Sequence, residues 1–414
     1  MNEAKQKFRL TSLERAWILY DVGNSAFVLL VATLIPIFFN ALAEGGGLSS
    51  VEYLAYWGYA ASAVTVITAV LSPILGTLAD TRNFKKPIFT FCVAVGVIGC
   101  CAMGMASTWL PFLLIFIFAK VGFSGSLVFY DSMLSDVTVP DRMDEVSSKG
   151  YAWGYIGSCV PFVVCLALVL GAGSIGISQM TALNLALFLT AAWWLVTTLP
   201  LLRQYKQVHF VEVQEHAIRQ SFARIGHTLR HLKEDRQVFW FLLAFFCYID
   251  GVYTIIDMAT AYGTALGLDT TGLLLALLVT QIVAFPSALV FGRLSGQYPS
   301  GTLIPVCIAA YTGIALFAFF LKHQWQFWVL AVVVGMFQGG IQALSRSHFA
   351  KIIPPEKSGE YFGLFDICGK GASFLGTMIV SVGSQLTGSA NVGVGSLIVL
   401  FIVGFVLFRV SDQK

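Results

Sequence analysis

The chain has 414 residues, of which 57% are hydrophobic and only 11% are charged. This composition excludes an ordinary soluble domain and a disordered chain. The net charge is only +3, and no basic patch with interleaved aromatic residues indicates nucleic-acid binding. We therefore expect a membrane protein whose surroundings are the lipid bilayer and which has no nucleic-acid partner.

Twelve apolar stretches are long enough, or nearly so, to cross a bilayer, whose core takes about 20 residues of helix. In chain order they are 16–39, 53–79, 87–106, 111–137, 147–170, 179–200, 238–262, 271–291, 302–321, 325–349, 360–385 and 393–409. Only helices and closed barrels satisfy every backbone group in lipid, and stretches of this length favour helices. The sequence predicts an all-α integral membrane protein with twelve transmembrane helices.

The first stretch follows a basic N-terminus, as the apolar part of a signal peptide does. It is too long for a signal peptide, carries Asp21 and Pro36, and has no small-residue cleavage site. We interpret it as a retained first helix.

Positive charge falls almost entirely on one side of the twelve stretches. With alternating connections, 22 of the 25 lysines and arginines lie on the side of the two termini, and the exceptions are Lys120, Lys322 and Lys370. Cytoplasmic loops carry such an excess. We expect a multi-pass protein of a bacterial inner (plasma) membrane with both termini in the cytoplasm.

A polar segment after the sixth stretch divides the chain into two halves. We predict a six-helix bundle over 1–200, a cytoplasmic linker over 201–236, and a second six-helix bundle over 237–414. Apolar residues recur in the linker at helical spacing, which predicts an amphipathic helix on the membrane surface; they are Ile218, Phe222, Ile225, Leu229 and Leu232.

The two halves repeat each other around the ends of the fourth and tenth stretches. Setting Asp131 on Arg346 also aligns Asp136 with Lys351. Internal repeats of this kind are typical of transporters, whose halves are related by an axis along the membrane normal. We predict two pseudo-symmetric bundles and hypothesise that both pairs form salt bridges that close the cytoplasmic side.

The loop after the second stretch carries a motif, Gly76-Thr77-Leu78-Ala79-Asp80-Thr81-Arg82-Asn83-Phe84-Lys85-Lys86. It resembles the signature loop of the major facilitator superfamily, glycine-x-leucine-alanine-aspartate-arginine-x-glycine-arginine-lysine. Thr81 and Phe84 replace basic positions, and Asn83 replaces the glycine. The resemblance implies that Asp80 is a conformational latch near the start of the eleventh helix, where free backbone N–H groups favour a carboxylate.

Four further segments narrow the resemblance. They are Ala16-Trp17-x-x-Tyr20-Asp21-x-x-Asn24-Ser25-Ala26-Phe27, Asp250-Gly251-Val252-Tyr253-Thr254-Ile255-Ile256, Gly339-Gly340-Ile341-Gln342-Ala343-Leu344-Ser345-Arg346-Ser347, and Gly359-Glu360-Tyr361-Phe362-Gly363 with Gly369-Lys370. The chain resembles the branch related to the fungal vacuolar amino-acid effluxer of autophagy. This implies a twelve-helix fold, alternating access and amino-acid efflux, with family positions at Asp21, Asp250 and Arg346. Asp257 departs from the family pattern and makes the cavity more negative.

Ionisable residues inside the stretches are costly in a bilayer, so they face a cavity or a partner. Asp250 has no basic residue near it on its own helix, which favours proton coupling. Asp366 and Lys370 are four residues apart and either neutralise each other or serve the site. Lys120 is either a counter-charge or an anchor for a substrate carboxylate. We predict a substrate and proton cavity of Asp21, Asn24, Lys120, Asp250, Asp257, Asp366, Lys370, Gln338 and Gln342, and a cytoplasmic gate of Asp80, Asp131, Asp136, Arg346 and Lys351.

These features favour a monomeric secondary active transporter of a small polar solute, such as an amino acid, coupled to protons. The chain has no phosphate-binding loop, no His-Glu-x-x-His and no Gly-x-Ser-x-Gly, so we expect no enzyme, no cofactor and no metal. The alternative is a non-transporting membrane receptor or scaffold on a transporter fold. That alternative predicts that Asp250 and Lys120 tolerate neutralisation.

Overall fold

The computed structural model describes residues 9–212, 230 and 232–412, without the side chains of 50, 51, 54, 260, 261, 264, 265, 270, 271, 274 and 370–374. Its regular elements are helices, and the one strand-like pairing among the described residues is an isolated bridge between Thr81 and Val211. The amphipathic helix predicted within the linker falls mainly on 213–229, outside the described residues.

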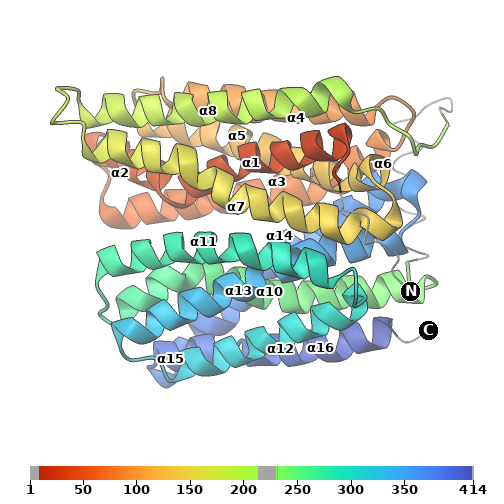
Figure 1. Ribbon diagram of the computed structural model, residues 1–414. Coiled ribbons are helices and arrows are strands. Elements are labelled where there is room, and N and C mark those ends of the chain that lie inside the picture. The colour runs from red at the N-terminus through yellow and green to blue at the C-terminus, as the bar shows by residue number, and fades with distance from the viewer. Residues whose placement is uncertain (1–8, 213–229, 231, 413–414) are drawn as a thin grey trace.

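The first half of the chain forms a bundle of long helices (Figure 1). Its elements are α1 (Ser12–Ala32), α2 (Leu34–Gly45), α3 (Ser50–Ala79), α4 (Lys85–Met103), α5 (Trp109–Ser132), α6 (Leu134–Val137), α7 (Pro140–Leu170) and α8 (Gln179–Gln204). Thr11 begins α1 with a capping box, in which its hydroxyl accepts from the Glu14 N–H and the Glu14 carboxylate accepts from the Thr11 N–H.

The second half forms a bundle beside the first, and Figure 1 shows α3 and α7 on the side that faces it. Its elements are α10 (Arg236–Ala265), α11 (Thr270–Leu294), α12 (Ser300–Phe319), α13 (Gln324–Ile352), the 3₁₀ turn η1 (Pro355–Lys357), α14 (Ser358–Thr387), α15 (Ala390–Gly395) and α16 (Ile398–Ser411). The halves meet mainly where α14 packs on α3 and where α11 and α13 pack on α7.

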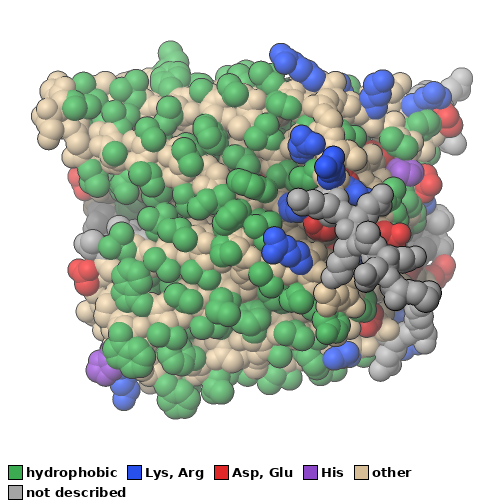
Figure 2. Space-filling view, viewed as in Figure 1, with side chains coloured by type: hydrophobic (Ala, Val, Ile, Leu, Met, Phe, Trp, Pro, Cys, Tyr) green, Lys and Arg blue, Asp and Glu red, His purple; other side chains and the backbone are tan. Residues whose placement is uncertain are grey.

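Eleven helical stretches of the described residues are long and apolar enough to cross a membrane. The broad hydrophobic band in Figure 2 runs across both bundles, and lysines and arginines gather toward one end of it. α14 is also 30 residues long, but the side chains of 370–374 within it are not described. The all-helical membrane fold is confirmed, and the number of twelve spans stays a prediction.

Three predicted spans contain breaks, and the twelfth divides at Ser396 and Leu397 into α15 and α16. The first divides at Thr33 into α1 and α2, because Pro36 has no N–H to donate to the carbonyl four residues before it. The fourth divides at Met133 into α5 and the four-residue α6. In the second half, the helix that corresponds to α5 is α13, which continues unbroken to Ile352. The two halves therefore no longer match in structure after Met133.

The helices α4 and α5 cross at a point where glycine allows close backbone contact. A Cβ added at Gly122 would lie 2.7 Å from the Gly96 nitrogen and 2.8 Å from the Cys92 carbonyl oxygen. Such small residues let membrane helices approach closely. The position tolerates no side chain without separating the two helices.

Gly122→Ala should therefore destabilise the protein by about 1–3 kcal/mol through overpacking. The measurement is the thermal unfolding midpoint Tm of the purified protein in detergent. Gly313→Ala is the matched control, since nothing lies within 4 Å of a Cβ there. It should keep or raise Tm, because alanine favours helix over glycine. Equal Tm values for the two variants would contradict the packing argument.

Candidate functional site

Arg346 of α13 is the centre of a buried polar cluster between the halves, and its side chain is only 2% exposed. Its Nη1 donates to Asp131 Oδ1 at the end of α5 over 3.0 Å and lies 3.7 Å from Asp21 Oδ2 on α1. Its Nε and Nη2 donate to the hydroxyl and the carbonyl of Ser147 on α7, at 2.9 and 3.0 Å. One guanidinium of the second half thus joins three helices of the first.

Aromatic rings of the first half surround the same guanidinium. Its carbon lies 4.3 Å from the ring centroid of Tyr151, 4.6 Å from that of Trp17 and 5.3 Å from that of Tyr130. A cation over such ring faces gains electrostatic attraction that increases as water is excluded. The Arg346 cluster, defined as Arg346 with Asp21, Asp131, Ser147 and these rings, replaces the water around a buried charge.

Of the residues predicted for the substrate cavity, Asp21 belongs to this cluster and Asn24 contacts Asp21. Asp21 Oδ2 accepts from the Tyr130 hydroxyl over 3.1 Å. The Asn24 amide donates to the Tyr20 carbonyl and to Asp21 Oδ1, within its own helix. Both side chains are buried, and they lie beside residues of the predicted gate.

The predicted pair Asp131–Arg346 is in contact, but the predicted pair Asp136–Lys351 is wrong. Lys351 Nζ instead donates to Asp144 Oδ2 on α7 over 2.5 Å, and Ser347 donates to Asp144 Oδ1 over 2.6 Å. The break at Met133 turns Asp136 away from the line of α5, which removes it from the register of the repeat.

Asp80 at the end of α3 meets the first turn of α14. Its Oδ1 accepts from the Gly359 N–H over 2.7 Å and its Oδ2 from the Glu360 N–H over 2.9 Å. A helix N-terminus offers unpaired N–H groups and the positive end of the dipole. Gly76 and Gly359 are in backbone contact, and a side chain on either one would overlap the other. We call Asp80 with these two amides the latch.

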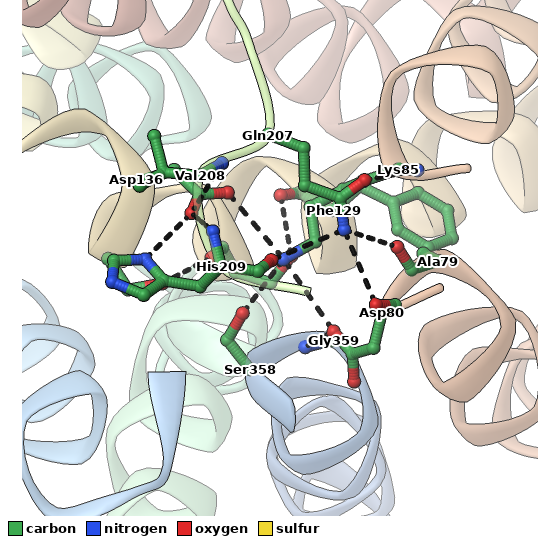
Figure 3. A network of polar contacts seen from close by, with 12 residues as sticks. Ala79, Asp80, Lys85, Phe129, Asp136, Gln207, Val208, His209, Ser358 and Gly359 are labelled. Carbon is green, nitrogen blue, oxygen red and sulfur yellow. Dashed lines mark hydrogen bonds and ion pairs between the residues drawn. The ribbon is translucent and has the colours of Figure 1, made fainter. Parts of the chain in front are cut away.

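Lys85 links the latch to Asp136 (Figure 3). Its ammonium is fully buried, donates to the Ser358 hydroxyl over 2.8 Å, and lies 3.6 Å from Asp80 Oδ1 and 3.9 Å from Asp136 Oδ2. Asp136 therefore acts in the network of the first half, and Lys85 connects it to α14.

Three other predicted cavity residues lie where α5, α10 and α14 approach one another. The Lys120 ammonium on α5 lies 4.7 Å from the ring centroid of Phe123 and acts electrostatically on Asp257 of α10, whose side chain is exposed. Asp366 on α14 accepts from the Ser72 hydroxyl over 2.7 Å. The side chain of Lys370, its predicted neighbour, lies outside the described residues.

Asp250 lies inside the second half and has no exposed surface. Its Oδ1 accepts from the Gly376 N–H over 2.8 Å and from the Thr254 hydroxyl over 3.3 Å. Its Oδ2 has no hydrogen-bond partner, and no ion pair joins it to a cation among the described residues. It is therefore a buried carboxyl with unfilled hydrogen-bonding capacity.

The two predicted glutamines of α13 face different surroundings. Gln342 contacts the first half, and Gln338 lies in the interior of the second bundle. Gln342 Oε1 accepts from the Tyr155 hydroxyl of α7 over 3.0 Å. Gln338 is buried, and its Oε1 has no hydrogen-bond partner among the residues that the structure describes. Gln338 also lines a mainly apolar cavity of the second half together with Thr254, Thr280 and Gln281.

A polar stripe of α7 contacts the predicted gate residues and is absent from the sequence prediction. Asp144, Ser147, Tyr151 and Tyr155 recur at spacings of three or four residues, so they share one helix face. The spacing could have revealed the stripe, although Arg142, Glu145 and Lys149 lie in the same turns of the helix. The aromatic contacts of Arg346 depend on α1 and α7 meeting in space, which no local pattern encodes.

Most hydrogen bonds between the halves fall near the same end, among the described residues, and the bonds Ser72–Asp366 and Tyr155–Gln342 lie deeper along the helices. The bonds near this end join the end of α3, the start of α4, the end of α5 and the start of α7 to the end of α13 and the start of α14. Figure 1 marks the N- and C-termini at this end, which we call the terminal end. The structure thus holds the two bundles together at the terminal end.

Two relatives are similar in sequence to this chain over most of its length or about two thirds of it. A protein of Bacillus subtilis described as an uncharacterized MFS-type transporter, YxiO, is 42% identical over 98% of this chain and 96% of its own length. Autophagy-related protein 22 of Coccidioides immitis is 25% identical over 65% of this chain and 51% of its own length. The chain matches only about half the length of such fungal relatives.

Solved structures with the same fold are more distant in sequence. The human organic anion transporter MFSD10 superposes with a TM-score of 0.72 at 13% identity, over 96% of this chain and 98% of its own. The transporter FucP in its outward conformation gives 0.71 at 17% identity, over 97% and 98%. At these identities the likeness establishes the fold alone.

The family model described as vacuole effluxer Atg22 like matches residues 12–141 and 135–414, which is nearly the whole chain. The motifs around Asp21, Asp80, Asp250 and Arg346 all lie inside the matched residues. The chain therefore belongs to the Atg22-like family of multi-pass membrane transporters in the major facilitator superfamily.

Proposed function

We propose that the protein is a secondary active transporter that exports amino acids by alternating access, coupled to protons. The observation that carries the proposal is the concentration of inter-half contacts at the terminal end, which must part for a solute to pass there. The halves over 1–200 and 237–414 are the bodies that move, and 201–236 is the linker between them. Autophagy-related protein 22 relatives and the effluxer description of the family support export.

The charges between the halves support a zwitterionic solute. Lys120 on α5 offers a cation for a carboxylate, while Asp257 and Asp366 on the opposite bundle offer carboxylates for an ammonium group. A solute with both groups would bridge the two bundles, and an uncharged solute would make no such charged bridge. Such a bridge gives the bound solute different contacts in the two conformations, which a transport cycle requires.

Asp250 is the proposed proton site. A buried carboxylate needs a counter-charge or several donors, and Asp250 has two donors on one oxygen and none on the other. Binding a proton removes the charge and supplies a donor for a new partner. A change of this kind alters how α10 packs against α14, the helix whose first amides bind Asp80 in the latch.

The orientation and assembly follow from the same proposal. The basic terminal end faces the cytoplasm by the positive-inside rule, so the closed gate is the cytoplasmic one. A bacterial relative, YxiO, supports a bacterial inner (plasma) membrane. We propose that one chain, as a monomer, is the transporting unit, since both halves of the gate lie in it.

Proton-driven uptake of a pooled set of labelled amino acids into proteoliposomes tests the substrate and the coupling. Saturable uptake that needs a proton gradient should appear in the wild type and be lost in Asp250→Asn, because the amide neither binds nor releases a proton. Uptake that is independent of the gradient and survives in Asp250→Asn would contradict proton coupling at this residue. No uptake of any pooled compound by folded protein would contradict the amino-acid proposal and favour the scaffold alternative.

The charge pair of the gate has its own test. Asp131→Asn and Arg346→Gln should each lower transport by about tenfold or more, because each leaves a buried charge without its partner. The exchange Asp131→Arg with Arg346→Asp should recover part of that loss in the same uptake assay. Arg293→Gln, an exposed cation of the same end, is the control and should transport normally. A folded double exchange that stays inactive would contradict a pairwise role.

A further inference from the structure

Eight linker residues after α8, 205–212, lie along the loop that carries the latch. Val211 N–H donates to the Asp80 carbonyl over 2.8 Å, and Arg82 N–H donates to the Val211 carbonyl over 3.1 Å. Gln207 Nε2 donates to the Ala79 carbonyl over 3.0 Å. These bonds fix the backbone on both sides of the Asp80 carboxylate.

Asp136 clamps the same segment from the other side (Figure 3). Its Oδ1 accepts from the His209 N–H over 2.8 Å and from the Val208 N–H over 3.3 Å, and it lies 2.9 Å from His209 Nδ1. Its Oδ2 accepts from the Tyr205 hydroxyl over 2.6 Å. The carboxylate is buried and its acceptor sites are directed at linker atoms, apart from the contact with Lys85.

We propose that residues 205–212 form a strap that positions the latch, with Asp136 as its anchor. The strap bonds Asp80 and the loop 80–85 through the backbone, so it sets the direction in which the Asp80 carboxylate points. It also sets the place of Lys85, whose ammonium lies between Asp80, Asp136 and the Ser358 hydroxyl. Asp136 is thus a positioning residue that acts on α14 through the loop.

The strap has a consequence for regulation. The chain that runs from the strap leads directly into the rest of the linker and then to α10, so the strap is the end of the covalent connection between the halves. A force on the linker, or a molecule bound to it, would therefore act on the strap and through it on the position of Asp80. Detachment of the strap frees the loop and lowers the cost of separating Asp80 from the N-terminus of α14.

The inference rests on the proposed transport cycle, because only halves that separate need a latch. The test therefore uses conformation and not transport. Spin labels are attached to cysteines at Val139 and Tyr298, exposed residues of the terminal end on opposite halves. Their distance distribution is measured by pulsed electron resonance in the full-length protein without substrate. The background is the parent without the two added cysteines, treated with the same label, because native cysteines such as Cys101 are partly exposed.

The strap is broken in two independent ways. Val211→Pro removes the N–H that donates to Asp80, and Val211→Ala, which keeps it, is the matched control. Asp136→Ala removes the anchor, and Asp141→Ala, an exposed aspartate of the same region, is its control. Asp80→Asn reports release of the latch itself. Asp136→Ala carries the test if Val211→Pro does not fold.

The expected result is that Val211→Pro and Asp136→Ala increase the population at long distances as Asp80→Asn does, while both controls match the wild type. A wider distribution for Asp80→Asn with wild-type distributions for both strap variants would overturn the strap and leave the latch in place. Wild-type distributions for all the variants, Asp80→Asn included, would overturn the strap and also count against opening at the terminal end.

Discussion

The closed arrangement of the two halves depends on the buried guanidinium of Arg346. Removing a permanent charge from water is costly, and here the hydration is replaced by Asp131, Ser147 and three aromatic rings. All of these partners belong to the first half, whereas the arginine belongs to the second. Since buried ion pairs roughly balance desolvation against attraction, closure can be firm in geometry and still reversible. A gate built from apolar contacts alone would lack this balance.

In the latch, too, a buried charge of one half is satisfied by groups of the other half, and here these are backbone N–H groups. Asp80 binds two N–H groups that every helix N-terminus leaves unpaired, so α14 needs no special side chain to receive it. When the halves separate, water can satisfy both the carboxylate and the amides. In the proposed transport cycle, the Arg346 cluster and the latch would therefore exchange protein contacts for hydration in the same movement, one at α13 and the other at α14.

Much of this could be predicted from the sequence, and the failures have physical causes. Hydrophobic length identified the membrane helices, and the loop motif identified Asp80, because both signals are local. The repeat identified Asp131 with Arg346, because α5 and α13 are still in register there. It failed for Asp136 because the helix breaks at Met133. Asp144 and the rings around Arg346 require knowledge of which helices meet, and the role of the linker requires knowledge of where the chain folds back.

The charges of the gate and those of the proposed cavity share one electrostatic environment. Asp131, which holds Arg346, is influenced by Asp366 of α14 and by Asp21 of α1. In a region with little water such influences are strong. A charged solute or a proton that changes the balance near Asp366 therefore also changes how favourably Asp131 holds Arg346. Coupling between the site and the gate then requires no chain of moving residues, because the carboxylates that would receive the solute lie within electrostatic reach of the pair that keeps the halves closed.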